Sequence, residues 1–243
     1  MEHYIGDPQD QIPDWHHQEL PNDCAVVAQM SIINQYVDHP ITETQAVYDS
    51  MVNGWMTTGG TDPSDVGNLL DLYGIPNHRV DGASVDQLVQ ELQAGHRVVV
   101  GVNSGELWDS GPMADLQNWL KDQLGLNGGS FNSADHAVDV IGVDVSDPAH
   151  PMVVLNDSGT PDGAGAEYPL DKFVDAWHGS DCFYVATDSA PPGGGRVDFD
   201  IFKYLGLSAP AATDAGQALV ASADVLTGNL INGFDWDDLL KAI

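Results

Sequence analysis

Cys24 opens a helix-like stretch that runs to Tyr36, and this position restricts both the fold and the chemistry open to the chain. A thiol attacks as its thiolate, and the unpaired N–H groups of a first helical turn stabilise negative charge. Gln18, six residues earlier, carries an amide that would donate to an oxyanion beside the Cys24 backbone N–H. A cysteine in an apolar helix is otherwise a small core residue. The rest of the chain decides between these two interpretations.

Groups that suit such a cysteine follow far downstream. His136 begins an alternating apolar strand that extends to Asp144, and a second strand over 152–155 leads into Asn156 and Asp157. The start of one strand and the end of its hairpin partner lie side by side. Asn156 or Asp157 would then orient the imidazole, which would activate the thiol. Neighbours on a strand point to opposite faces, so only one of the two should reach His136.

The order of these residues is similar to that of papain-like enzymes. The chain resembles the papain-like cysteine peptidases of the bacteriocin-processing type, peptidase family C39, and more closely their stand-alone relatives that lack a transporter. The resemblance implies an α+β papain-like fold, in which an N-terminal helical part with the nucleophile helix packs on an antiparallel sheet that carries the histidine and the Asn or Asp. It spans about residues 10–188 and rests on the segments 15–29, 59–70, 88–102, 135–144 and 154–157.

The resemblance also implies a role for each candidate residue. Cys24 would be the nucleophile, His136 the general base and acid, and Gln18 a donor in the oxyanion hole. We favour Asp157 as the group that orients His136, while Asn156 stays open because papain itself uses an asparagine. The expected activity is hydrolysis of a peptide amide bond through a thiol acyl-enzyme.

Two positions depart from the family pattern. Ala25 stands where glycine often follows the cysteine, and Ser158 stands where proline often follows the aspartate. These departures leave room for a catalytically inactive papain-like binding module. A papain-like transamidase or small-molecule amidase also stays open, because it would share the same set of residues with a peptidase.

The charge of the chain limits its partners. Seven basic residues against 37 acidic ones give a formal net charge of −30, so nucleic acid and anionic membranes are unsuitable partners. We expect a peptide or protein substrate; the acidic surface either keeps the protein soluble or attracts cationic peptides. No stretch reaches the length of a membrane span, and the first residues lack the features of a signal peptide. The location stays open between cytoplasm and export with an absent leader.

We expect no cofactor and no metal. The chain has no HExxH motif, and two cysteines separated by the whole domain make no zinc knuckle. Cys24 and Cys182 should both be reduced, because pairing would block the proposed nucleophile, and Cys182 is expected in the core. His16 and His17 are expected at the surface or at the edge of a substrate site.

Periodicity and capping signals predict the remaining elements. Helices are expected to start after Thr42, Asp62 and Ser84, the second of them continuing as one helix to Gly74. A fourth helix should end at Gly179. Buried strands are expected over 97–102 and 183–186, the latter closing the sheet.

The chain is expected to divide into three parts. A papain-like domain covers 1–190, a Pro/Gly linker covers 191–195, and an apolar tail covers 196–243. The tail would dock on the domain itself or on a partner. Residues 104–133 look like an insertion that forms a packed surface helix or a lid over the cleft.

Overall fold

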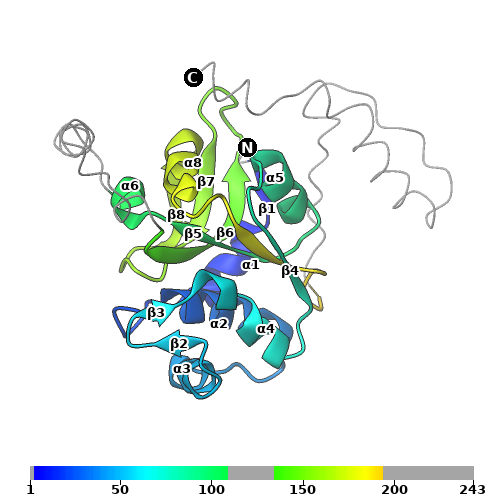
Figure 1. Cartoon of the computed structure of the whole chain (residues 1–243). Coiled ribbons are helices and arrows are strands. Elements are labelled where there is room, and N and C mark those ends of the chain that lie inside the picture. Colours follow the sequence, from blue (N-terminus) through cyan, green and yellow to red (C-terminus); the bar gives the residue numbers. More distant parts are fainter. Residues whose placement is uncertain (1–2, 109–133, 194–243) are drawn as a thin grey trace, which may run out of the picture. The chain divides into compact units, whose positions relative to one another are not determined.

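The computed structural model of the chain describes residues 3–108 and 134–193, shown coloured in Figure 1. They form an α+β fold of helices and antiparallel strands, as predicted. The predicted tail, and most of the predicted insertion, lie outside the described residues. In chain order the elements are β1 Tyr4–Gly6, α1 Pro8–Gln11, η1 Ile12–Asp14, α2 Cys24–Tyr36, α3 Glu43–Val52, β2 Met56–Thr57, β3 Gly60–Thr61, η2 Pro63–Asp65, α4 Asn68–Leu72, β4 Asn77–Val80, α5 Val85–Gln93, β5 Val98–Val102, α6 Ser104–Trp108, β6 His136–Asp144, β7 Met152–Asn156, β8 Ala164–Pro169, α8 Leu170–His178 and β9 Tyr184–Thr187.

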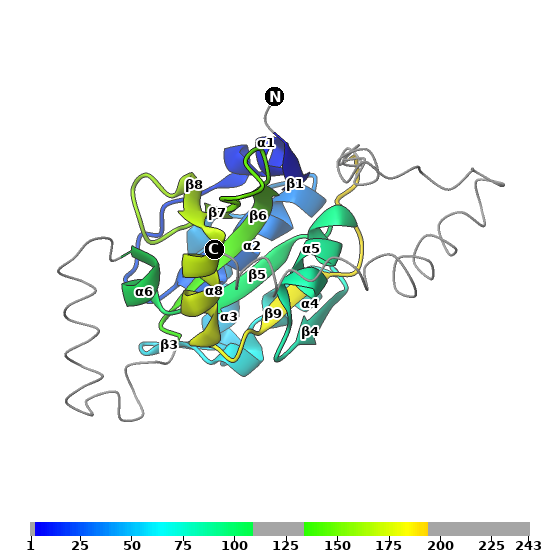
Figure 2. The same cartoon turned by 90° about the horizontal axis from the view of Figure 1, so that it is seen from above.

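One antiparallel sheet organises the domain. Its strand order is β4-β9-β5-β6-β7-β8, and the short β1 also pairs with β6. On one edge of β6, residues 136–140 pair with β5 and residues 142–144 pair with β1. The helices α2, α3 and α4 lie on one side of the sheet, and α5 and α8 lie on the other (Figures 1 and 2). The strand that begins with His136 is therefore central and almost entirely buried.

Helix α2 carries the largest share of the core beneath this sheet. Residues 25–33 are all buried, because the helix packs against the sheet on one side and against α3 and α4 on the other. Its far end is fixed by the Tyr36 hydroxyl, which donates to Thr187 Oγ1 at 2.8 Å. The first turn of α2 is thus held in a fixed position relative to the start of β6.

The predicted helix caps are confirmed at three positions. The Thr42 side chain accepts from the Gln45 N–H, Asp62 accepts from the Ser64 N–H, and Ser84 forms a capping box with Gln87. The helix predicted from Asp62 to Gly74 is wrong as one piece: it divides into η2 and α4. Gly67 lies between them with φ of 107°, a left-handed conformation that ends one helix before the next begins.

The edges of the sheet differ from the prediction. Strand β9 lies between β4 and β5, so the last strand is inserted into the sheet and does not close it. Strands β4 and β8 were not predicted, because each is half-exposed and lacks a clear apolar alternation. Cys182, just before β9, is a buried core thiol as predicted, and burial raises its pKa. Within the described part of the chain, every helix falls short of the length and apolarity that a bilayer crossing requires.

Candidate active site

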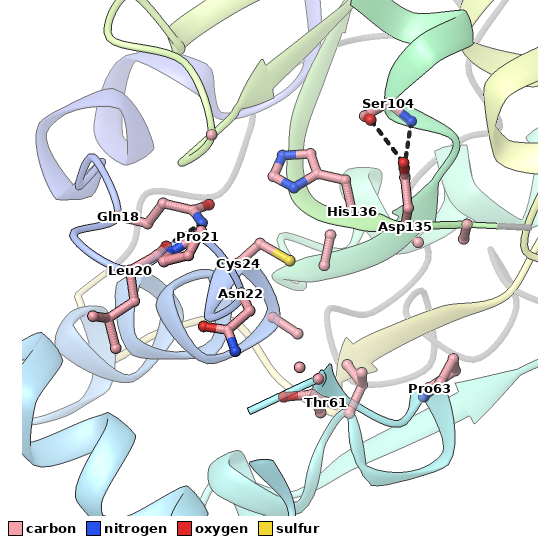
Figure 3. Close-up of a pocket in the computed structure, with 18 of the residues that line it drawn as sticks. Gln18, Leu20, Pro21, Asn22, Cys24, Thr61, Pro63, Ser104, Asp135 and His136 are labelled. Atoms are coloured by element: carbon pink, nitrogen blue, oxygen red, sulfur yellow. Dashed lines mark hydrogen bonds between the residues drawn. The ribbon is translucent and has the colours of Figure 1, made fainter. Parts of the chain in front are cut away.

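The first turn of α2 and the start of β6 meet at one pocket of about 720 Å³. Cys24 is the first residue of α2 and is half-buried, so its sulfur reaches the pocket while its backbone belongs to the helix. In Figure 3 the Cys24 side chain lies between Gln18 and His136. The sequence separation of these three residues is large, but the packing of α2 under the sheet brings them together.

His136 is the central group of this site. Its Nε2 bonds Asp157 Oδ1 at 2.7 Å, and it also shares a side-chain hydrogen bond with Cys24, for which Nδ1 is the remaining ring nitrogen. Burial alone lowers the pKa of His136. The bonds and charges of Asp157 and Cys24 outweigh that effect and raise the pKa to about 9. The ring therefore favours the imidazolium form at neutral pH, which is the form that stabilises a neighbouring thiolate.

Asp157 is fully buried and held from several directions. The Trp108 indole N–H donates to Oδ2 and the Gly159 N–H donates to Oδ1, both at 2.8 Å. The Asp157 carbonyl accepts from the Trp15 indole at 2.8 Å. Burial raises the pKa of Asp157, but His136 and these donors together hold it below its usual value. The carboxylate therefore stays charged and fixed against His136.

Asn156, the other candidate, does not reach His136. Its Nδ2 donates to the Gln11 carbonyl at 2.8 Å, and its Oδ1 accepts from the Gly165 N–H at 3.1 Å. The two neighbours thus point in opposite directions, as the alternation along a strand requires. Asn156 ties β8 and the N-terminal segment together and takes no part in the pocket.

Gln18 and the Cys24 backbone face the same side of the pocket. Gln18 Nε2 donates one hydrogen to the Leu20 carbonyl at 2.6 Å, which leaves a second amide hydrogen. The Asp23 side chain does not cap α2, and among the described residues no acceptor takes the Cys24 N–H. Both groups are therefore able to donate to an oxygen atom bound near the sulfur.

A second cluster lies directly behind this segment. His16 Nε2 and carboxylate oxygens of Glu19 and Glu43 lie within 4.8 Å of one another, a spacing that suits metal ligands. Glu43 already bonds His16 at 2.7 Å and the Glu19 N–H at 2.8 Å. Burial and the adjacent Glu43 raise the pKa of Asp23, the residue before Cys24, to about 7. Hydrogen bonds to His16 and to the Glu19 N–H already occupy Glu43, and the raised pKa of Asp23 favours its neutral form. We assign no metal to this cluster.

Several residues of this site were not predicted. The Trp108 ring lies against His136 at a tilt of 58°, with ring centroids 5.1 Å apart, and its indole N–H donates to Asp157. A Cβ atom at Gly159 would lie 2.8 Å from His136 Cε1, so only glycine fits there. His16 bonds Glu43 while its side chain stays 41% exposed, and His17 lies at the pocket edge, so both lie where they were predicted. A glycine two residues after the aspartate was the only sequence signal for these contacts.

Comparison with known proteins gives a family for most of the chain. The model of the Peptidase_C39 like family matches residues 8–183, which is well over half of the chain. The chain belongs to this family. The matched region contains Gln18, Cys24, His136 and Asp157, so the C39-like region includes every residue that meets at the pocket.

Relatives with curated sequences add little about activity. An uncharacterized protein of Mycobacterium bovis and one of Mycobacterium tuberculosis are each 33% identical to this C39-like chain over 137 residues. The match covers 53% of this chain and 53% of each relative. The chain thus spans about half the length of the curated relatives it matches.

Two solved structures are similar at low identity. A C39-like peptidase from Bacillus anthracis is 17% identical, with a TM-score of 0.48, covering 73% of this chain and 95% of that chain. The peptidase domain of Streptococcus ComA, a bifunctional ABC transporter, is 13% identical, with a TM-score of 0.47 and coverages of 73% and 98%.

Proposed function

We propose that this C39-like chain is a cysteine peptidase that hydrolyses a peptide amide bond through a thiol acyl-enzyme. The observation that carries the proposal is the arrangement around His136, whose ring is bonded to Asp157 and to Cys24 beside one pocket. A histidine held by a carboxylate on one side and a thiol on the other is the arrangement that nucleophilic catalysis by cysteine needs.

In the first half of the proposed reaction, the Cys24 thiolate attacks the carbonyl carbon of the scissile bond. A C–S bond forms, and the carbonyl π electrons move to oxygen. The second amide hydrogen of Gln18 and the Cys24 N–H stabilise this oxyanion. The His136 imidazolium then gives its proton to the leaving amine as the C–N bond breaks, which leaves a thioester on Cys24.

In the second half, water replaces the amine. Neutral His136 takes a proton from the water, the resulting hydroxide attacks the thioester, and the C–S bond breaks to release the acid. Asp157 keeps the ring in one orientation through both halves. The raised pKa of His136 suits this cycle because the ring begins as the acid and acts as the base only after the amine has left.

The size and chemistry of the pocket agree with a peptide substrate. At about 720 Å³ it exceeds the space needed for one side chain, and residues 59–61 are among those that line it. Glu19 and Asp135 are among the residues that line it, and among the described residues no Lys or Arg does. The lining therefore tolerates a neutral or cationic peptide better than an acidic one.

The first test is alkylation by iodoacetamide, resolved by mass spectrometry for Cys24 and Cys182 across pH 4–10. We expect fast labelling of Cys24 well below about pH 8.5, the usual pKa of a thiol, and loss of this fast phase in His136→Ala. Cys182 is the internal control, because burial raises its pKa and keeps it slow. Slow labelling of Cys24 that does not depend on His136 would instead favour the inactive binding module.

A further inference from the structure

The Gln18 amide is fixed at both of its ends. Its Nε2 donates to the Leu20 carbonyl at 2.6 Å, and its Oε1 accepts from the Ser158 hydroxyl at 3.0 Å. A carbonyl oxygen only accepts hydrogen bonds, so the nitrogen end of the amide must face Leu20. The amide plane is therefore set by two contacts, which use one of the two amide hydrogens. Figure 3 shows the Gln18 side chain among the residues that line the pocket, beside Cys24.

Ser158 joins the two halves of the site through the backbone. It follows Asp157, which holds His136, and its carbonyl accepts from the Gln18 N–H at 3.0 Å. The Ser158 residue is 4% exposed, so its hydroxyl has little access to water. One dipeptide therefore fixes the base on one side and contacts Gln18, by backbone and side chain, on the other.

We infer that Ser158 is a positioning residue of the oxyanion hole, which acts by holding the Gln18 amide in the orientation that donates to the substrate oxygen. This inference rests on the proposed function. Without the hydroxyl, Oε1 loses its donor and the amide is held at the nitrogen end only. The last torsion of a glutamine side chain is broad, so the amide then samples orientations that do not point at the pocket.

Two reagents separate this role from a general effect on the nucleophile. When a peptide aldehyde binds, the Cys24 thiolate adds to the aldehyde carbon, the π pair moves to oxygen, and the oxygen takes the His136 proton. That product carries its oxygen where Gln18 donates. Iodoacetamide instead loses iodide as the C–S bond forms, and no oxyanion develops. Only the aldehyde therefore depends on the orientation of Gln18.

The test is Ser158→Ala. We expect aldehyde affinity and kcat/KM for a peptide substrate to fall about fivefold to tenfold, the size expected for one lost hydrogen bond, with most of the loss in kcat. The rate and pH dependence of Cys24 alkylation should stay unchanged. Ser180→Ala is the matched control, because its hydroxyl bonds the carbonyl of pocket-lining Gly101 but does not contact Gln18. It should leave both aldehyde affinity and alkylation unchanged.

A double-mutant cycle with Gln18→Ala completes the test. We expect Gln18→Ala alone to cost about 100-fold in kcat, and Ser158→Ala to cost no more than twofold further in that background, because its effect acts through Gln18. Two results would overturn the role of Ser158 and leave the proposed function standing. One is an unchanged aldehyde affinity in Ser158→Ala. The other is the same loss of kcat from Ser158→Ala in the wild-type and Gln18→Ala backgrounds. If wild-type Cys24 neither binds the aldehyde nor depends on His136 for alkylation, the proposed function fails and the role of Ser158 fails with it.

Discussion

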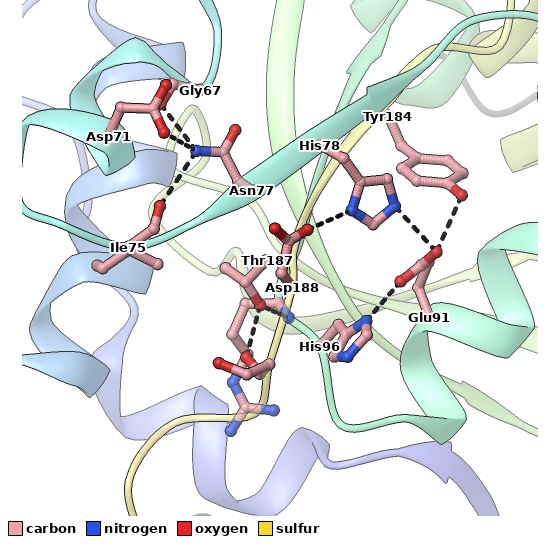
Figure 4. Close-up of polar contacts among 12 residues, drawn as sticks. Gly67, Asp71, Ile75, Asn77, His78, Glu91, His96, Tyr184, Thr187 and Asp188 are labelled. Carbon is pink, nitrogen blue, oxygen red and sulfur yellow. Dashed lines mark hydrogen bonds and ion pairs between the residues drawn. The ribbon is translucent and has the colours of Figure 1, made fainter. Parts of the chain in front are cut away.

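Two of the places where histidine meets carboxylate in the described residues use the imidazole differently. His136 gives Nε2 to Asp157, and its other ring nitrogen is left for the Cys24 thiol. His78 gives both ring nitrogens to carboxylates (Figure 4). An imidazole with one nitrogen on a reactive group is able to move a proton during a reaction. An imidazole with both nitrogens occupied only joins the elements around it.

The His78 cluster, which consists of His78, Glu91, His96, Tyr184 and Asp188, joins β4, α5 and β9. His78 on β4 bonds Asp188 at 2.8 Å and Glu91 of α5 at 3.2 Å. Glu91 also bonds His96 at 2.6 Å and accepts from the Tyr184 hydroxyl at 3.1 Å. Every partner in this set comes from a different turn or element, so the cluster fixes α5 against the edge of the sheet. Pairing with a carboxylate is therefore not the feature that marks a catalytic histidine.

The sharpest way to break this comparison is to remove each imidazole. His136→Ala should lower kcat/KM for a peptide substrate on the order of 10⁴-fold, because the general acid and the partner of the thiolate are both lost. His78→Ala should keep kcat/KM within twofold per folded molecule. Steady-state hydrolysis, normalised to the concentration of folded protein by circular dichroism, measures both. A similar loss in the two variants would mean that His136 has only a structural role.

A smaller effect is expected from removing only the charge beside His136. Asp157→Asn should lower kcat/KM by about tenfold to 100-fold, since the ring loses the anion that stabilises its imidazolium form. The pKa of His136, about 9 in the wild type, should fall. The alkaline limb of the pH–activity profile, where the imidazolium loses its proton, should therefore move to lower pH.

Asn156→Ala provides the matched control for that variant. It removes a buried amide that bonds Gln11 and Gly165, so it should lower the free energy of unfolding by about 1–3 kcal/mol. The pH–activity profile of the folded fraction should not move. A shift of the alkaline limb in Asn156→Ala, or none in Asp157→Asn, would reverse the assignment of the orienting residue.

The residues that carry reactive groups were the predictable part of this site. Cys24, His136 and Asp157 each stand at the end of a strongly patterned helix or strand, so local pattern places them at element ends. The choice of Asp157 over Asn156 rested on the family resemblance. The alternation of side chains along a strand predicts that one of the two neighbours points inward, but it does not identify which one. The structure supplies that answer through the partners of Asn156 on β8 and α1.

The supporting residues were not predictable for a physical reason. Trp108 and Ser158 make side-chain hydrogen bonds to segments far apart in the chain: 49 residues separate Trp108 from Asp157, and 140 separate Ser158 from Gln18. Such isolated contacts produce no repeating pattern in the sequence from which they could be predicted. Strand β4 was missed similarly, since its residues 77–80 are only half-buried and pair with a strand more than 100 residues later.

The smallest expected effect concerns the His78 cluster and is a change in the free energy of unfolding. Burial lowers the pKa of His78, but Asp188 and Glu91 outweigh it, so the pKa is raised on balance. The stability this adds is fully present below the unfolded pKa of about 6.5 and is lost as pH rises through the folded pKa. The pKa of Glu91 is lowered by its histidine partners against the effect of burial. Its contribution is present above the unfolded pKa of a glutamate and is lost as pH falls through the folded value.

Both contributions are therefore present together near pH 6, where Glu91→Gln should lower the free energy of unfolding by about 1 kcal/mol, the upper range for a partly exposed ion pair. The decline of stability as pH rises above about 6.5 should become shallower in this variant, while kcat/KM stays within twofold. Urea unfolding at several pH values measures the change. Asp147→Asn is the matched control, because Asp147 and His150 form a pair on the exposed surface that should contribute nothing measurable. An equal effect in both variants would show that general surface charge sets the pH dependence, and the cluster of Figure 4 would then lose the structural role that separates it from the His136 site.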